Sequence, residues 1–248
     1  MPELIQTPLR IDRPAEGFYT TRLPAHHDRP VRTFLPTDYQ PHYAYPLVVL
    51  LHGNGGSEES VGRLAPRVSR RNYIAISLRG PQVLGKRADG REAFGWDGDS
   101  TDDSSIEDYL IRAIEQTRRT YHVHSERIFL AGICEGAEVA YRIGLGMADR
   151  IAGVIALNGQ IPKATGVPLF RLGAVRDLPV LIGHGRSNAM IPYTGAQRDH
   201  RLLYAAGANV RLVGYDTDHK IHPNMLRDVN RWIMNGVNAE SESLARHM

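Results

Sequence analysis

The chain alternates short apolar runs with helical patterns over most of its length, and this alternation restricts its fold more than any other feature. Apolar runs occur at residues 47–51, 73–78, 127–131, 151–157, 180–182 and 210–215. Helical patterns lie between or after them, near residues 58–70, 105–120, 137–143, 195–206 and 223–235. Short apolar runs of this kind are typical of buried parallel strands. The sequence therefore predicts an α/β fold, with a mostly parallel central sheet and helices on both faces.

Three segments depart from this alternation. Strand-like pieces at residues 18–21 and 31–35 are separated by prolines, so we expect antiparallel edge strands within residues 1–45. Residues 80–105 form a long polar stretch, which we expect to line a pocket as a loop. The tail at 237–248 is polar enough to fray. Because 248 residues can form one large core, we expect one domain over residues 1–248.

The composition excludes several classes of partner. The net charge of +3 comes from 30 basic and 27 acidic residues that are scattered along the chain, so we expect no nucleic-acid partner. The longest strongly apolar run, at 47–51, is too short to span a membrane. The N-terminus lacks the pattern of a signal peptide, and a single cysteine forms no disulfide within the chain. We expect a cytoplasmic protein without a cofactor, and the sequence leaves a homodimer open.

The only cysteine, Cys134, stands in the motif Gly132-Ile133-Cys134-Glu135-Gly136, between a predicted strand and a predicted helix. This is the nucleophile-elbow pattern Gly-x-Ser-x-Gly with sulfur in place of oxygen. A lone cysteine is most often a buried and inert residue. Here, however, the flanking glycines allow a strained turn that exposes the central side chain at the head of the sheet. Cys134 is therefore the candidate nucleophile.

A glycine-rich segment, Leu51-His52-Gly53-Asn54-Gly55-Gly56, ends the first central strand. Ligands gather beyond the carboxyl ends of such strands, and a turn of this kind can aim N–H groups at a developing oxyanion. The N–H of Asn54 and the N–H of Glu135 would form a two-donor oxyanion hole. His52 and Gly53 are candidate pocket residues. The alternative is a simple strand-to-helix turn, while a phosphate-binding loop is disfavoured because its Lys and Ser/Thr are absent.

Residues 184–192 and 216–223 follow the last two predicted strands, which gives the chain order nucleophile, orienting residue, histidine. With these motifs, residues 30–236 resemble the α/β-hydrolase family, especially its phospholipase/carboxylesterase and dienelactone hydrolase branches. Their His-Gly-x-x-Asp-x-x-x-Pro pattern is similar to residues 184–192, with Asn188 at the acid position. Their Gly-His-x-Ile pattern is similar to residues 218–221, with His219 as the histidine. The resemblance implies an α/β-hydrolase fold and the catalytic roles of Cys134, Asn188 and His219.

The cysteine and the asparagine are physically linked replacements. A thiol has an ordinary pKa of about 8.5, which a helix N-terminus and a neighbouring histidine lower. We therefore expect a thiolate–imidazolium pair that exists before substrate arrives. The third residue then has only to orient the ring, which a neutral asparagine carbonyl does in papain-like proteases. The charge of Glu135, next to the sulfur, opposes this thiolate.

Other residues compete for the same roles. His222 precedes Pro223 at a helix start, where a capping role is more ordinary, so His219 is favoured as the base. His184 is expected to be a packed residue that bonds the backbone. Three aspartates remain alternatives to Asn188 as the orienting residue: Asp199, Asp216 and Asp218. The spaced histidine pair is weak support for a metal, and we expect no metal site.

The long polar stretch offers candidate pocket residues. Phe94 and Trp96 are expected to form an apolar wall, and Arg79, Arg87 or Arg91 to meet an anionic group; the alternative is a solvated loop anchored by its aromatic residues. The predicted function is hydrolysis of carboxylic esters, thioesters or lactones, with a small-molecule acyl substrate and a covalent acyl-thioenzyme. The alternatives are an acyltransferase that uses the same intermediate and a non-catalytic binding module on this scaffold.

Overall fold

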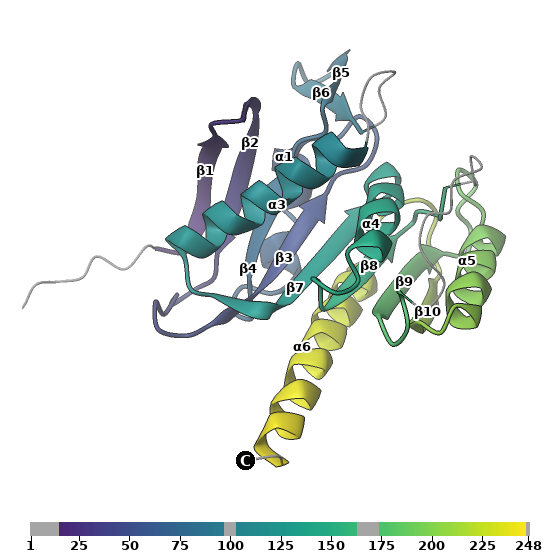
Figure 1. Ribbon diagram of the computed structural model, residues 1–248. Helices are drawn as coiled ribbons and strands as arrows, with labels where there is room; N and C mark the ends of the chain where they lie inside the picture. Colours follow the sequence, from purple (N-terminus) through teal and green to yellow (C-terminus); the bar gives the residue numbers. More distant parts are fainter. Residues whose placement is uncertain (1–14, 97–102, 163–173, 247–248) are drawn as a thin grey trace, which may run out of the picture.

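The computed structural model describes residues 15–96, 103–162 and 174–246, with side chains as far as residue 238 (Figure 1). The strands are β1 (Gly17–Leu23), β2 (His26–Leu35), β3 (Tyr45–Leu51), β4 (Ile74–Leu78), β5 (Gln82–Lys86), β6 (Glu92–Gly95), β7 (Val123–Ile133), β8 (Gly153–Leu157), β9 (Pro179–Gly185) and β10 (Asn209–Tyr215). The helices are α1 (Glu58–Gly62), α2 (Ala65–Val68), α3 (Asp103–Thr120), α4 (Glu135–Gly146), α5 (Tyr193–Ala205) and α6 (Pro223–Arg246).

Eight of these strands form one sheet in the order β1-β2-β4-β3-β7-β8-β9-β10. The pairs from β4 to β10 are parallel, while β1 pairs with β2 and β2 pairs with β4 in the antiparallel sense. The predicted α/β class, the mostly parallel sheet and the antiparallel N-terminal edge strands are confirmed. The parallel strands bring all their carboxyl ends to one edge, where the segments after β3, β7, β8, β9 and β10 meet.

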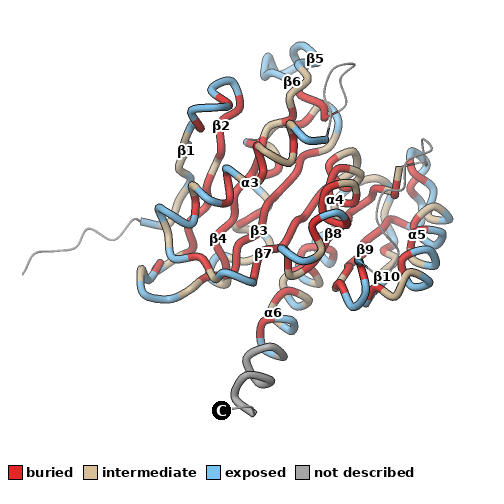
Figure 2. The backbone as a smooth tube through the Cα atoms, in the orientation of Figure 1, coloured by how far each residue is buried: buried red, intermediate tan, exposed pale blue. Residues whose placement is uncertain are grey.

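The central strands are buried on both faces because helices cover each side (Figures 1 and 2). In β3, Leu47, Val49 and Leu51 pack into a core with residues of α3, α4 and α5. Val48 and Leu50 point the other way, into a second core with residues of α1, α2 and α6. The continuous apolar run at 47–51 follows from this double burial, because a strand covered on both faces needs apolar side chains at every position.

The helix expected near residues 58–70 is two short helices, α1 and α2. Pro66 stands in the first turn of α2, where its missing N–H costs nothing, whereas the interior of one long helix would lose a hydrogen bond there. The final helix was expected to end near residue 235, before Gly236. It continues to Arg246, and the buried Val237 packs into the second core. Tertiary packing therefore carries α6 past a residue that often ends helices.

The segment at 80–105, expected to be a loop, contains the antiparallel hairpin of β5 and β6. This hairpin stands at the carboxyl edge of the main sheet and is largely exposed along β5 (Figure 2). Buried and exposed residues do not alternate along β5. The sequence of β5 therefore lacks the alternating apolar pattern by which a strand is usually predicted. The rest of this segment lies partly outside the described residues, as does the first part of the N-terminal region.

Candidate active site

Cys134 sits at a sharp strand-to-helix turn between β7 and α4. It is the N-cap residue of α4 and has φ 54° and ψ −119°, a backbone conformation that non-glycine residues rarely adopt. Close contacts on both sides demand glycine: a Cβ at Gly132 would lie 1.9 Å from the Gly136 carbonyl oxygen, and one at Gly136 would lie 2.4 Å from the Leu51 carbonyl oxygen. The motif therefore builds a tight elbow that presents the half-buried Cys134 side chain at the carboxyl edge of the sheet.

The glycine-rich turn after β3 lies directly against this elbow. A Cβ at Gly53 would come within 3.1 Å of the Cys134 Cβ. The backbone N–H groups of Glu135 and Asn54 both donate to the Cys134 sulfur. The two predicted oxyanion donors thus converge beside the thiol, as a pair of donors for an oxygen on the attacked carbonyl must do.

His219 lies beside Asn188, which holds its ring in one orientation. The Asn188 side-chain oxygen accepts hydrogen bonds from the backbone N–H groups of Met190 and Ile191, each at 3.1 Å, and it lies 3.2 Å from His219 Nδ1. Because two backbone donors identify this atom as the amide oxygen, Nδ1 must carry the proton and donate to it. The unprotonated nitrogen of His219 is then Nε2, the nitrogen that a general base uses.

The competing residues have other partners. Asp216 faces Arg186, Asp218 pairs with Lys220, and the fully buried Asp199 accepts from the Ile161 N–H and pairs with Arg198. The His222 Nδ1 accepts the Asn224 N–H near the start of α6, and the buried His184 donates from Nε2 to the Ile191 carbonyl at 2.7 Å.

The electrostatic environment favours the neutral forms of Cys134 and His219. Burial raises the pKa of the Cys134 thiol, the Glu135 and Asn54 N–H groups oppose this, and the carboxylates of Glu135 and Glu138 raise it further. Burial lowers the pKa of His219, and the Asp218 carboxylate only partly opposes this. Both shifts favour a thiol and an imidazole over the expected thiolate–imidazolium pair, because burial and two nearby carboxylates outweigh the two N–H donors.

His52 and Trp96 lie beneath the surface and support the turn after β3. The His52 Nδ1–H donates to the Gly53 carbonyl at 2.9 Å, and its Nε2 accepts the Gly80 N–H at 2.9 Å. Trp96 is fully buried, and its indole N–H donates to the His52 carbonyl at 2.8 Å. The expectation that Trp96 forms a wall exposed to substrate is corrected, because the side chain is used to anchor the hairpin segment.

Phe94 and the arginines of this region also contact the protein itself. The Phe94 N–H donates to the Gly56 carbonyl, and the Arg79 guanidinium lies over the Phe94 ring at 4.4 Å while it pairs with Glu58. Arg87 donates to the Gly55 carbonyl at 2.6 Å. Arg91 is exposed on the hairpin. Arg79 and Arg87 are thus already engaged in holding the hairpin against the turn.

Comparison with known proteins identifies the relatives of this chain. The model of the phospholipase/carboxylesterase family matches residues 39–235. The chain belongs to the phospholipase/carboxylesterase family. It is 25% identical over 151 residues to the putative esterase NocK of Nocardia uniformis subsp. tsuyamanensis, covering 60% of this chain and 42% of that protein, so it spans less than half of that relative's length. It is 22% identical over 178 residues to acyl-protein thioesterase 1 of Cryptococcus neoformans var. neoformans, covering 65% of this chain and 75% of that protein.

A solved structure supports the fold of this family member. The Bacillus cereus carboxylesterase superimposes with a TM-score of 0.63 at 20% identity, covering 83% of this chain and 93% of that chain. At this identity the likeness supports the shared fold alone.

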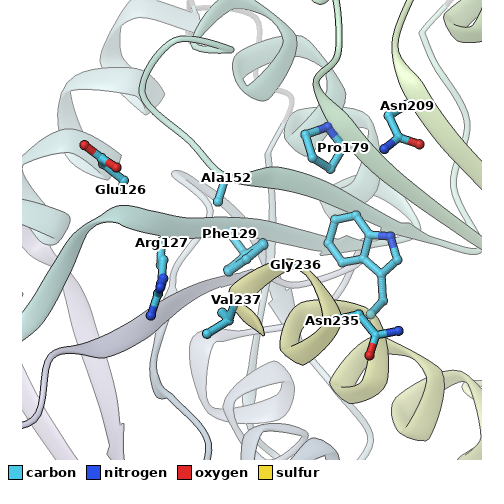
Figure 3. Close-up of a pocket in the computed structure, with 10 residues that line it drawn as sticks. Glu126, Arg127, Phe129, Ala152, Pro179, Asn209, Asn235, Gly236 and Val237 are labelled. Atoms are coloured by element: carbon cyan, nitrogen blue, oxygen red, sulfur yellow. The ribbon is translucent and has the colours of Figure 1, made fainter. Parts of the chain in front are cut away.

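A cavity of about 380 Å³ lies between the main sheet and α6 (Figure 3). Phe129 lines it from the middle of β7, and Val237 lines it from α6. Ala152, Pro179 and Asn209 line it from the amino ends of β8, β9 and β10. The elbow lies at the opposite, carboxyl edge of the sheet, so this cavity is separate from the candidate active site. Within the described ranges, no three His, Cys, Asp or Glu side chains form a metal-binding cluster. No helix in the same part of the chain is both long and apolar enough to cross a membrane.

One residue at this edge, Asn158, follows β8 and could not be identified from the sequence. Its side chain contacts the backbone of the His219 loop and the end of β9. In the sequence, Asn158 and Gly159 form an Asn-Gly pair after an apolar run, which indicates only a turn. Its contacts are with residues at least 27 positions away, so no local pattern could reveal them.

Proposed function

We propose that this protein is an acyl hydrolase that cleaves carboxylic esters, thioesters or lactones through a covalent acyl-thioenzyme. The observation that carries the proposal is the convergence of the Asn54 and Glu135 N–H groups on a sulfur held at a strained elbow. Strain of this kind persists only where the surrounding structure enforces it, and it is concentrated at functional sites. The ordered His219–Asn188 pair at the same edge of the sheet supplies a base.

In the acylation step, the Cys134 sulfur attacks the carbonyl carbon while His219 Nε2 takes the thiol proton. The carbonyl electron pair moves onto oxygen, which the Asn54 and Glu135 N–H groups stabilise. Collapse of this intermediate breaks the bond to the leaving group, and the imidazolium returns its proton to the departing alcohol or thiol. The raised pKa of Cys134 and the lowered pKa of His219 favour neutral groups before attack, so the charge develops during attack, as in a serine hydrolase.

In the deacylation step, His219 takes a proton from water as the water oxygen attacks the thioester carbonyl. The same two N–H groups stabilise the second oxyanion. When this intermediate collapses, the carbon–sulfur bond breaks, the acid is released, and the Cys134 sulfur regains its proton from His219. Esters and thioesters suit this route better than amides, because amides have poorer leaving groups. The similarity to a putative esterase and to an acyl-protein thioesterase supports the same chemistry.

Intact-mass spectrometry after brief incubation with 4-nitrophenyl acetate tests this proposal. We expect an acetyl adduct on the wild-type protein that decays with release of acetate. Cys134→Ala should form no adduct. His219→Ala should form the adduct more slowly and retain it longer, because deacylation lacks its base.

Two outcomes contradict hydrolysis at Cys134. An adduct on the wild type that persists until an added alcohol or amine removes it would indicate an acyltransferase. The absence of both adduct and turnover with short and long esters and thioesters would favour a binding module.

A further inference from the structure

Asn158 connects three of the segments that meet at the carboxyl edge of the sheet. Its side-chain nitrogen donates to the carbonyl oxygens of His219 at 3.0 Å and Lys220 at 3.3 Å. Its side-chain oxygen accepts the Gly185 N–H at 2.8 Å. One amide therefore ties the end of β9 to the loop that carries the proposed base.

The position of Asn158 is itself fixed with respect to the nucleophile. The preceding residue, Leu157, accepts the Cys134 N–H at 2.9 Å, and the Asn158 N–H donates to the Gly183 carbonyl at 2.9 Å. A Cβ at Gly159 would lie 2.7 Å from the Cys134 carbonyl oxygen. The segment at residues 157–159 is thus packed against the elbow, and Asn158 reaches from it to His219.

Asn158 is fully buried and has φ 52°, in the left-handed region. Asparagine is among the few non-glycine residues that tolerate this conformation. A glycine would adopt the same backbone more readily, so the backbone alone does not account for an asparagine here. The side chain instead satisfies two carbonyl groups and one N–H that converge on this point.

We infer that Asn158 is a positioning residue, which sets the distance and orientation of His219 with respect to Cys134. This inference rests on the proposed role of His219 as the general base. Asn188 holds the His219 ring through Nδ1, and Asn158 holds the backbone from which that ring projects. The two asparagines therefore hold both the ring and the backbone of His219, and neither side chain is charged. A displacement of about 1 Å in such a group can lower a rate by roughly 100-fold.

Two substitutions separate the role of the Asn158 side-chain N–H donor from the roles of its backbone conformation, size and acceptor oxygen. Asn158→Gly removes the side chain and keeps a residue that accepts positive φ. Asn158→Asp keeps the size and the acceptor for the Gly185 N–H, but a carboxylate cannot donate to the His219 carbonyl. Asp177→Gly is the matched control, because Asp177 also has a positive φ of 62° and is exposed before β9, away from the site.

The imidazole spectrum of the ¹⁵N-histidine-labelled protein is the first readout, with the His219 signals assigned from His219→Ala. In the wild type we expect the Nδ1–H tautomer and a pKa below the ordinary value. In Asn158→Gly and Asn158→Asp we expect a mixture of tautomers. In the 4-nitrophenyl acetate assay, kcat should fall by about 10- to 100-fold with little change in KM. The same substitutions should cost little further activity in a His219→Ala background.

Three outcomes overturn the inference: an unchanged His219 tautomer in both variants, wild-type behaviour of Asn158→Asp, or an equal effect of Asp177→Gly. Equal losses of kcat with and without His219 also contradict it, because they indicate a general structural role. The imidazole spectrum requires no turnover. If the protein shows no hydrolase activity, the spectrum therefore still tests whether Asn158 positions His219.

Discussion

In the proposed mechanism, Asn188 stands where a carboxylate would stabilise the imidazolium that forms during attack. Because burial lowers the pKa of His219, a negative charge at position 188 would favour the transition state of the proposed reaction. The site can accept the substitution, since Asn188 already receives three N–H donors on one oxygen. We expect Asn188→Asp to raise kcat by about tenfold or more and to raise the pKa of His219, measured by the pH dependence of 4-nitrophenyl acetate turnover.

Asn188→Ala is the matched control for this charge effect. It removes the acceptor for His219 and two backbone N–H groups, so kcat should fall below that of the wild type. A lower kcat in Asn188→Asp than in the wild type would contradict this expectation. It would indicate that activity requires the amide nitrogen of Asn188 as well as its oxygen.

The sequence indicated which candidate site residues lie close together, but not the electrostatic environment around them. The turn at Cys134 depends on neighbouring glycines, and the order of the later motifs reflects the strand order, so both can be inferred from the chain. The protonation of Cys134 and His219 depends on burial, which distant elements determine. For the same reason the sequence could not reveal that Trp96 is fully buried.

At the scale of elements, the β5–β6 hairpin holds the glycine-rich turn after β3 through its C-terminal end. Trp96 follows β6 and donates to the buried His52 carbonyl. We expect Trp96→Phe to lower the free energy of unfolding by about 1–3 kcal/mol, because it leaves that carbonyl unpaired. The KM for 4-nitrophenyl acetate should not change. Thermal denaturation followed by circular dichroism, together with steady-state kinetics, checks both expectations.

Val83→Ala provides the control on the same hairpin. Val83 is 66% exposed, so its truncation should leave the unfolding free energy within about 0.5 kcal/mol of the wild type. If Trp96→Phe raises KM and leaves stability unchanged, the ring contacts substrate after all and the anchoring role is wrong.

The elements that the sequence missed are those determined by distant contacts. The strands of the main sheet are apolar on both faces and could be predicted directly. The hairpin exists because Phe94, Trp96 and Arg87 bond the turn after β3, and none of these contacts leaves a periodic pattern. The extension of α6 depends likewise on the burial of Val237 in the second core.

At the scale of the whole molecule, the buried His52 links stability to pH. Burial lowers its pKa from 6.5 to about 4, although the Gly53 carbonyl opposes the shift. As the pH falls through 6.5, the unfolded chain binds a proton at His52 that the folded protein does not bind until about pH 4. The free energy of unfolding must therefore decrease across this window, by about 3 kcal/mol from this residue alone, and level off below it.

Urea unfolding between pH 4.5 and 7.5 measures this slope. His184 and His219 contribute in the same direction, because burial lowers the pKa of each, whereas the raised pKa of Asp199 acts in the opposite direction. His52→Gln removes one titrating group, so the slope should flatten by up to about 1.4 kcal/mol per pH unit, while the protein is less stable at pH 7.5. A slope that matches the wild type would show that His52 is not the group that couples folding to protons. His52 would then support the turn after β3 through its two hydrogen bonds without making folding sensitive to acid.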